Sequence, residues 1–200
     1  MSIMLLNDTP FKVLELFTRD YSVSIHGWEA SKRLNLNQKS VANTLLRLEE
    51  KMILTSSRKG RNRPYRLNIK NPSLHYILTM VETEKAIRFR DGSGLPLEYI
   101  KMILGCGSPL VIVFGSYATF SNDSQSDLDL VVVKPFEMDL EAIERIYKIR
   151  PSIKSYSIKE FKKALELGDF LMREVVNNHV VLLGAELFVR MNMEASNGQG

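Results

Sequence analysis

The chain has 200 residues, of which 44% are apolar and 25% are charged, and its formal net charge is +4. This composition excludes a disordered chain and allows two small domains or one larger domain. No basic segment precedes the first apolar patch, later apolar stretches are interrupted, and Cys106 has no partner for a disulfide; we therefore expect a cytoplasmic protein without a signal peptide or membrane span.

The charge is unevenly distributed along the chain. Residues 1–70 contain 13 Lys and Arg against 6 Asp and Glu, whereas residues 71–200 contain 14 against 17. The first part therefore carries a net charge of +7 and the second a net charge of −3. This difference in net charge predicts that the first part binds a polyanion and that the second part has another role.

Three helices are expected in the basic part. Residues 10–19 and 27–34 carry apolar side chains at helical spacing, and a third helix is expected after Asn37, which is a plausible N-cap. The buried stripe of this third helix is predicted to consist of Val41, Leu45, Leu48 and Met52. The second and third helices together are typical of a helix-turn-helix.

A cationic hairpin is predicted next. Residues 53–69 contain two short β-prone runs around a turn at Gly60. Five cations fall within nine positions of this segment: Arg58, Lys59, Arg61, Arg63 and Arg66. Their mutual repulsion would be relieved by a phosphate backbone.

Three helices followed by a basic hairpin, over residues 8–70, resemble the winged-helix DNA-binding domains of bacterial and archaeal regulators. The resemblance implies that the third helix enters the major groove of double-stranded DNA. The side chains expected to be exposed there are Gln38, Lys39, Ser40, Asn43, Thr44 and Arg47. The hairpin cations would then lie along the DNA backbone or minor groove. The alternative is a protein–protein module whose charge run is a solvated face.

A connecting helix is predicted within residues 71–93, beginning near Pro72 and ending before a glycine-containing break at 91–94. This helix is interpreted as a spacer or a dimer contact, and we expect a homodimer because winged-helix proteins commonly dimerise. The three histidines are His26, His75 and His179, and none has an acidic or cysteine partner at ligand spacing.

Two strands and a sharp turn follow from residue 109. Residues 109–114 and 127–133 are predicted strands, and Gly115-Ser116 is a turn between them. Asp127 and Asp129 share one face of the second strand because side chains alternate, and their repulsion favours a bound Mg²⁺. At the turn, Gly115 allows a phosphate to approach the backbone, and Ser116 offers a hydroxyl and N–H groups to an anion.

Gly115-Ser116, ten intervening residues and Asp127-Leu-Asp129 resemble the signature of nucleotidyltransferases of the DNA polymerase β superfamily, in particular the minimal nucleotidyltransferase domains. The resemblance implies an α/β domain with a short mixed sheet that uses Mg²⁺ and ATP or another nucleoside triphosphate. It also implies that Gly115 and Ser116 hold the triphosphate and that Asp127 and Asp129 are the catalytic metal ligands. The segment after residue 155 is similar to the end of these domains in prokaryotic proteins that also carry a winged helix.

One feature departs from this family pattern. The superfamily normally has a third carboxylate on the strand that follows the next helix, where it helps hold the metal and can deprotonate the acceptor hydroxyl. The corresponding strand here, residues 151–157, contains no Asp or Glu. Glu160 is better explained as half of a helix capping box.

The expected fold class is α+β. Residues 1–70 are predicted to be a winged helix-turn-helix, 71–93 a connecting helix and linker, 94–190 a nucleotidyltransferase-like domain, and 191–200 a disordered tail.

Two functions follow from these parts. The first is Mg²⁺-dependent transfer of a nucleoside monophosphate, most plausibly AMP from ATP, to a hydroxyl of a small molecule or of a partner protein such as a toxin nuclease. The second is a DNA-binding transcriptional regulator whose nucleotidyltransferase-like domain only senses nucleotide, dimerises or binds a partner.

Overall fold

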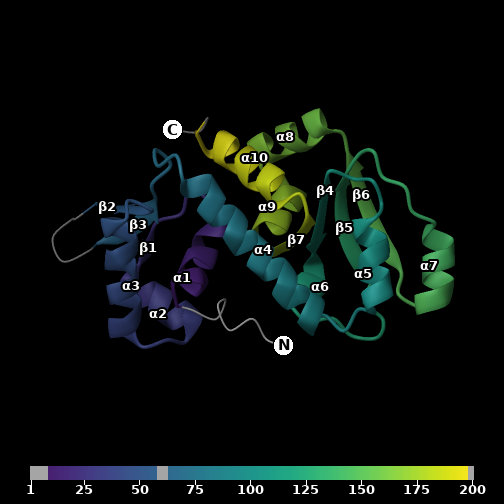
Figure 1. The fold of residues 1–200 in the computed structure, drawn as a ribbon, viewed down its shortest axis with the longest axis horizontal. Coiled ribbons are helices and arrows are strands. Elements are labelled where there is room, and N and C mark those ends of the chain that lie inside the picture. Colours follow the sequence, from purple (N-terminus) through teal and green to yellow (C-terminus); the bar gives the residue numbers. More distant parts are fainter. Residues whose placement is uncertain (1–8, 58–62, 198–200) are drawn as a thin grey trace. The chain divides into compact units, whose positions relative to one another are not determined.

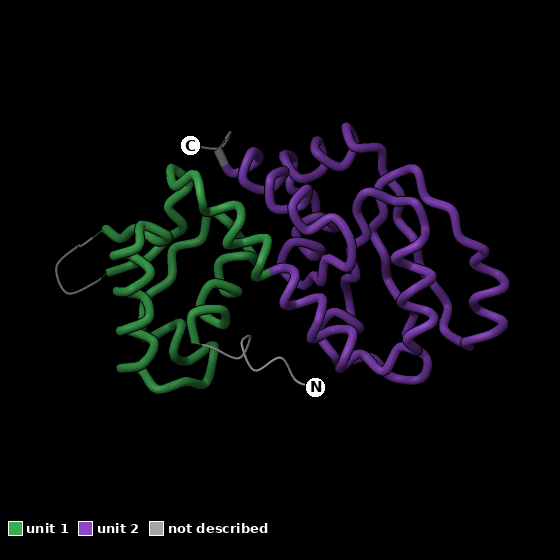
Figure 2. Tube along the Cα trace, viewed as in Figure 1, with its two compact units in different colours: residues 1–81 green, residues 82–200 purple. Residues whose placement is uncertain are grey.

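The computed structural model describes residues 9–57 and 63–197, and both helices and strands are present (Figure 1). The chain divides into two compact units, Met1–Val81 and Glu82–Gly200, here called unit 1 and unit 2 (Figure 2). The expected α+β class is therefore confirmed. Within the part of the chain that the structure describes, no helix is both long and apolar enough to cross a membrane.

Unit 1 combines helices with a small antiparallel sheet of strand order β1-β3-β2. Its elements are α1 (Thr9–Thr18), β1 (Ile25–His26), α2 (Gly27–Leu34), α3 (Gln38–Glu50), β2 (Leu54–Ser56) and β3 (Pro64–Leu67). Helix α4 (Leu74–Gly92) begins in unit 1 and ends in unit 2.

Helix α3 begins where the sequence predicts. The Asn37 side chain accepts hydrogen bonds from the backbone N–H groups of Lys39 and Ser40, which have no partner within the helix. The inward stripe of Val41, Leu45 and Leu48 is buried as expected. Met52 is a correction, because the helix ends at Glu50 and Met52 lies beyond it with a φ of 55° and 66% of its surface exposed.

Unit 2 is built on a mixed four-stranded sheet of order β6-β5-β4-β7, in which only the β5–β6 pair is parallel. Its elements after α4 are α5 (Leu97–Leu104), β4 (Leu110–Phe114), α6 (Gly115–Ala118), β5 (Leu128–Val133), α7 (Leu140–Tyr147), β6 (Pro151–Tyr156), α8 (Ile158–Leu167), α9 (Phe170–Asn177), β7 (His179–Leu183) and α10 (Ala185–Asn197).

Apolar clusters cover both faces of this sheet. On one face, Leu128 and Leu130 of β5 pack with side chains of α5 and α7. On the other face, Val131 packs with side chains of α8, α9 and α10. Because side chains alternate along a strand, Asp129 belongs to the second face, together with Val131. The prediction that the two leucines face away from the aspartate is confirmed.

The helix starts in unit 2 follow local capping signals. Asp139 caps α7 by accepting from the Ala142 N–H at 3.0 Å. Ser157 and Glu160 form the predicted capping box at the start of α8, since each side chain accepts from the backbone N–H of the other residue.

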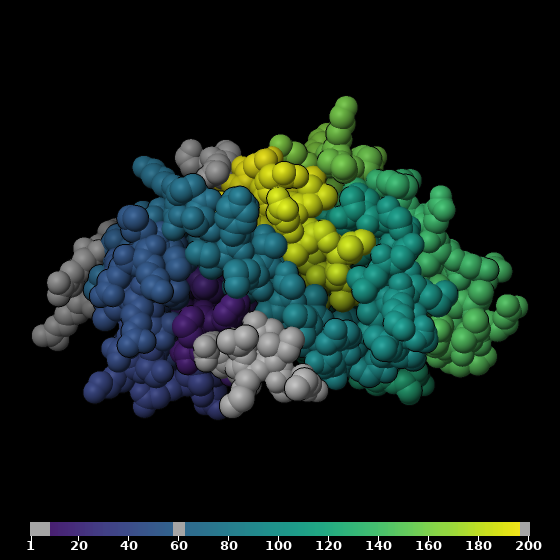
Figure 3. Space-filling model, viewed as in Figure 1, coloured from purple at the N-terminus to yellow at the C-terminus, as the bar shows by residue number. Residues whose placement is uncertain are grey.

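The predicted disordered tail from residue 191 was wrong, because α10 extends to Asn197. Met191 and Asn192 are buried, and Met191 belongs to the apolar cluster on the second face of the sheet. Helix α10 lies alongside α8 (Figure 3), and Lys162 of α8 forms an exposed ion pair at 2.7 Å with Glu194 of α10. Apolar side chains at helical spacing therefore order this segment despite its polar end.

Candidate functional site

The first candidate site is the corner between β4 and β5 in unit 2. Gly115 follows β4 directly and has a φ of +69°, a conformation that favours glycine. A Cβ placed on Gly115 would lie only 2.7 Å from Oδ2 of Asp129. The two halves of the predicted motif therefore meet in space, and any side chain at position 115 would displace the Asp129 carboxylate.

Asp127 and Ser116 complete this corner. Asp127 immediately precedes β5 and is exposed, whereas Asp129 is half-buried within the strand. The Ser116 carbonyl accepts from the Ser121 N–H at 3.0 Å and from the Thr119 hydroxyl at 3.1 Å, which closes the turn after α6. Within the described residues the Ser116 hydroxyl makes no hydrogen bond, so it remains available to a ligand.

The strand beside Asp129 carries no acid. In the parallel β5–β6 pair, Asp129 is in register with Ser152, and Val131 is in register with Lys154. Residues in register on neighbouring strands point to the same face, so Ser152 and Lys154 occupy the positions nearest Asp129 on that side. Among the residues that the structure describes, no group of three or more His, Cys, Asp or Glu side chains could hold a metal ion. Among the described residues, the structure therefore adds no third carboxylate to Asp127 and Asp129 at this corner.

A buried charged cluster lies next to this corner. Lys85 Nζ is 2.8 Å from Glu82 Oε2 and 2.8 Å from His179 Nε2, and His179 Nε2 is 3.1 Å from Glu82 Oε2. His179 Nδ1 donates to the Val176 carbonyl at 2.7 Å. The other carboxylate oxygen, Glu82 Oε1, is buried without a hydrogen-bond partner.

The electrostatics of this cluster keep Glu82 ionised. Burial by itself would raise the pKa of Glu82, but the charges and hydrogen bonds of His179 and Lys85 outweigh burial and lower that pKa to about 2. His179 is also paired with Phe114, the residue before Gly115, across the β4–β7 ladder. The cluster therefore ties the second half of α4 to the end of the strand that leads into the corner.

His179 has no acidic partner at ligand spacing in the sequence, as stated above, but the folded chain brings it an acidic partner from a distant segment. Its partners Glu82 and Lys85 lie more than ninety positions earlier in the chain. Spacing rules detect ligand pairs that are close in sequence, and they cannot detect a strand residue that meets a distant helix. The available signal was the Glu82/Lys85 pair itself, which lies three residues apart on one helix face.

The second candidate site is the exposed side of α3 in unit 1. Five of the residues predicted to be exposed there are exposed: Gln38, Lys39, Ser40, Asn43 and Arg47. Thr44 is a correction, because only 8% of it is exposed and its hydroxyl donates to the Ser40 carbonyl at 3.0 Å. An internal hydrogen bond allows a threonine to lie on the inward side of the helix.

The hairpin cations differ in whether their charge is paired within the protein or exposed to solvent. Arg63 forms an ion pair with Glu49 of α3 and donates to the Ser56 hydroxyl at 3.0 Å. Arg66 of β3 is exposed between the buried residues Tyr65 and Leu67. The predicted contacts of Arg58, Lys59 and Arg61 lie outside the described residues. Arg63 therefore holds the hairpin against α3, while Arg66 presents its charge to solvent.

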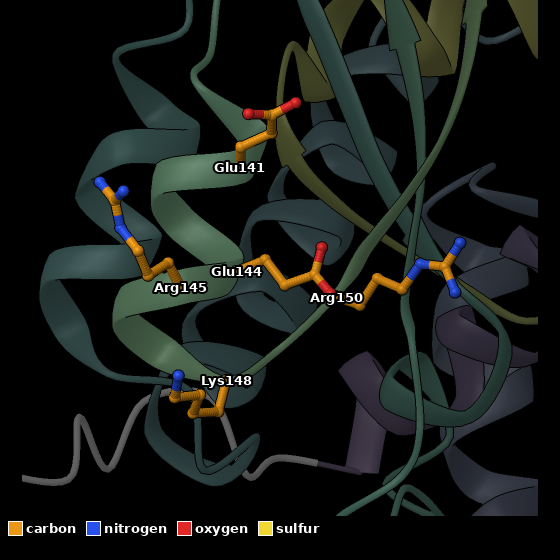
Figure 4. Close-up of a pocket in the computed structure, with 5 residues that line it drawn as sticks. All are labelled: Glu141, Glu144, Arg145, Lys148 and Arg150. Carbon is orange, nitrogen blue, oxygen red and sulfur yellow. The ribbon is translucent and has the colours of Figure 1, made fainter.

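A surface hollow of about 450 Å³ lies at α7. The backbone of one lining residue, Arg150, accepts from the Leu128 N–H at 2.8 Å, so the hollow reaches the start of β5. It is lined by Glu141, Glu144, Arg145, Lys148 and Arg150. Figure 4 shows that these side chains point in different directions rather than toward a common centre. The hollow has mixed charge and no convergent polar groups, so it is a weaker candidate for a ligand site than the corner.

Comparisons of the chain with protein-family models, with curated proteins and with solved structures found no match.

Proposed function

We propose that unit 2 binds a nucleoside triphosphate together with Mg²⁺ at the corner formed by Gly115, Ser116, Asp127 and Asp129, and that unit 1 binds double-stranded DNA. The observation that carries the first half is the close approach of Asp129 to Gly115. Gly115 has a positive φ and no side chain, so the Asp129 carboxylate lies directly against its backbone, at a turn whose serine hydroxyl makes no hydrogen bond among the described residues. This arrangement brings an anion-binding group and a cation-binding group to the same place.

The residues of the corner fit a magnesium ion. The donors are carboxylate oxygens, which are the hard ligands that Mg²⁺ prefers, and two carboxylates suffice when substrate phosphates supply further oxygens. Asp127 and Asp129 would hold the ion. Bound Mg²⁺ would neutralise part of the negative charge of the phosphates. Gly115 would admit a phosphate to the backbone, and the Ser116 hydroxyl would donate a hydrogen bond to it.

DNA binding by unit 1 is supported by its element order and its charge. Three helices followed by a hairpin is the order expected of a winged helix. The exposed residues of α3 include the cations Lys39 and Arg47 and the amides Gln38 and Asn43, which are side chains suited to phosphates and base edges. The net charge of +7 over residues 1–70 adds a general attraction to a polyanion.

Binding without turnover is the role that the corner supports best, and the protein would then be a regulator that senses nucleotide. Strand β6 presents Ser152 and Lys154 beside Asp129, so the chain offers no third carboxylate there to deprotonate an acceptor hydroxyl. Removing a general base typically costs two to four orders of magnitude in rate.

Transfer of a nucleoside monophosphate to a hydroxyl is the second candidate function. The juxtaposition of Gly115 and Asp129 favours it, because the same groups would position the triphosphate for attack. The acceptor, a small molecule or a partner protein, would have to bring its own base. Release of pyrophosphate that depends on Asp127 and Asp129 would identify this activity.

The proposed nucleotide site is tested by calorimetric titration of Mg²⁺-ATP into the wild type and the Asp127→Asn/Asp129→Asn variant. We expect binding to the wild type, loss of binding in the double variant, and unchanged DNA binding in both. Asp123→Asn is the matched control, because Asp123 is an exposed acid of the same loop whose Oδ1 accepts from the Gln125 N–H at 2.9 Å, a bond that asparagine can keep. Absence of binding to the wild type, or persistence of binding in the double variant, would overturn the proposal.

A further inference from the structure

The turn after α6 contains a residue whose backbone is unusual for its side chain. Phe120 has a φ of +56°, a conformation in which bulky residues are rare. The Ser121 N–H donates to the Ser116 carbonyl at 3.0 Å, and the Phe120 N–H donates to the Tyr117 carbonyl at 3.2 Å. These two bonds form a Schellman motif, in which the residue at this position is usually glycine. The backbone therefore favours glycine where the sequence has phenylalanine.

Core packing alone does not explain the aromatic ring. Phe120 remains 51% exposed. Its ring contacts Phe89 at 6.1 Å between centroids, in a tilted arrangement. A Cβ on Gly92 would lie 3.2 Å from Cε1 of the ring, so the glycine leaves room for it. Phe89 and Gly92 thus support the ring from one side, while the rest of it faces solvent.

Phe120 belongs to the same turn as Gly115 and Ser116 of the corner. Phe120 lies four residues after Ser116, and the Ser121–Ser116 hydrogen bond holds it to the same turn. The Thr119 hydroxyl reinforces the turn through bonds to the carbonyls of Gly115 and Ser116. A supported, half-exposed aromatic ring therefore lies on the turn that carries the groups proposed to bind phosphate.

We infer that Phe120 is a stacking platform for the base of the nucleotide bound at the corner; this inference rests on the proposed function. A nucleotide is a ligand that combines a polyanion with a flat aromatic ring, and the turn offers a partner for each. Every base has a π-face, so a stacking contact tolerates different bases. The ligand class is accordingly a nucleoside triphosphate bound without strong base selection.

The test compares two probes, Mg²⁺-ATP and Mg²⁺-tripolyphosphate, by calorimetry with the intact chain. Tripolyphosphate carries the charge of the nucleotide but has no base. We expect Phe120→Leu to weaken ATP binding about tenfold or more and to leave tripolyphosphate binding unchanged, because leucine keeps apolar packing and removes the π-face. Phe120→Trp should retain ATP affinity.

Two further variants separate stacking from folding. Phe120→Gly suits the backbone of the Schellman motif, so it should fold, keep tripolyphosphate binding and lose ATP affinity. Phe170→Leu is the matched control, because Phe170 is an exposed phenylalanine on α9, and it should change neither titration.

Each other outcome overturns the inference in a distinguishable way. Equal ATP affinity in the wild type and in the Leu and Gly variants would show that the ring does not contact the base. A parallel loss of ATP and tripolyphosphate binding would mean that Phe120 only maintains the turn. If the wild type binds neither probe, the proposed nucleotide site itself fails, and the stacking role fails with it.

Discussion

Each unit contains a glutamate that joins a cation and a third polar side chain, but the surroundings of the two clusters differ. Glu82 of unit 2 is fully buried and contacts Lys85 and His179. Glu49 of unit 1 is partly exposed and contacts Arg63 and Ser56. Water and salt screen the charges of the second cluster much more strongly than those of the first. We therefore expect that breaking the buried cluster costs much more folding free energy than breaking the partly exposed one.

Glu82→Gln gives the largest expected effect. The substitution leaves the Lys85 charge buried without its partner, and removing one member of a buried ion pair typically costs about 3–5 kcal/mol of folding free energy. Urea denaturation followed by circular dichroism measures this loss. The double variant Glu82→Gln/Lys85→Met removes both charges and should be less destabilised than Glu82→Gln alone. Equal losses in the two variants would show that the Lys85 charge is not the cause.

The second-largest expected effect is the loss at low pH of the stabilisation that ionised Glu82 gives to the fold. The pKa of Glu82 is lowered from 4.5 to about 2 in the folded protein, so its ionised form stabilises the fold above the unfolded pKa. That stabilisation, roughly 3 kcal/mol, is lost as the pH falls from about 4.5 toward 2. The difference in unfolding free energy between the wild type and Glu82→Gln should therefore shrink between pH 5 and pH 3. A constant difference would contradict the lowered pKa.

The smallest expected effects are in unit 1, where Arg63 and Arg66 form a matched pair of hairpin cations. Arg63→Ala breaks a partly exposed ion pair and should cost only about 0.2–1 kcal/mol of stability. Arg66 is exposed, so Arg66→Ala should leave stability unchanged and reduce the salt slope of DNA binding by about one. Urea denaturation and DNA titrations at several salt concentrations test both variants. A salt slope unaffected by Arg66→Ala would remove β3 from the proposed DNA surface.

Local signals predicted much of this fold. Asn37 caps α3 and the capping box at Glu160 starts α8 as expected, because a capping side chain bonds to N–H groups two or three residues away. The expectation that the Gly115-Ser116 turn and Asp129 act together came from the family resemblance, and the structure places Gly115 beside Asp129.

The misses have a common physical origin in contacts between distant segments. Thr44 lies inward because the core of unit 1 reaches that side of α3. Arg63 turns back to Glu49, fourteen positions away, rather than outward. His179 of β7 contacts Glu82 of α4, which lies 97 positions earlier in the chain. Phe120 was missed for another reason, because its left-handed backbone follows from the turn geometry and not from its residue type.

The order of strands in unit 2 has a consequence for association between molecules. Strand β6 forms one edge of the four-stranded sheet, so its outer backbone groups are not used by a neighbouring strand. An open edge invites strand addition and aggregation, and exposed lysines and prolines are common protections against both. Pro151 lacks an N–H, and Lys154 is exposed. The strand that lacks an acid beside Asp129 thus carries two features that disfavour the addition of another strand at this edge.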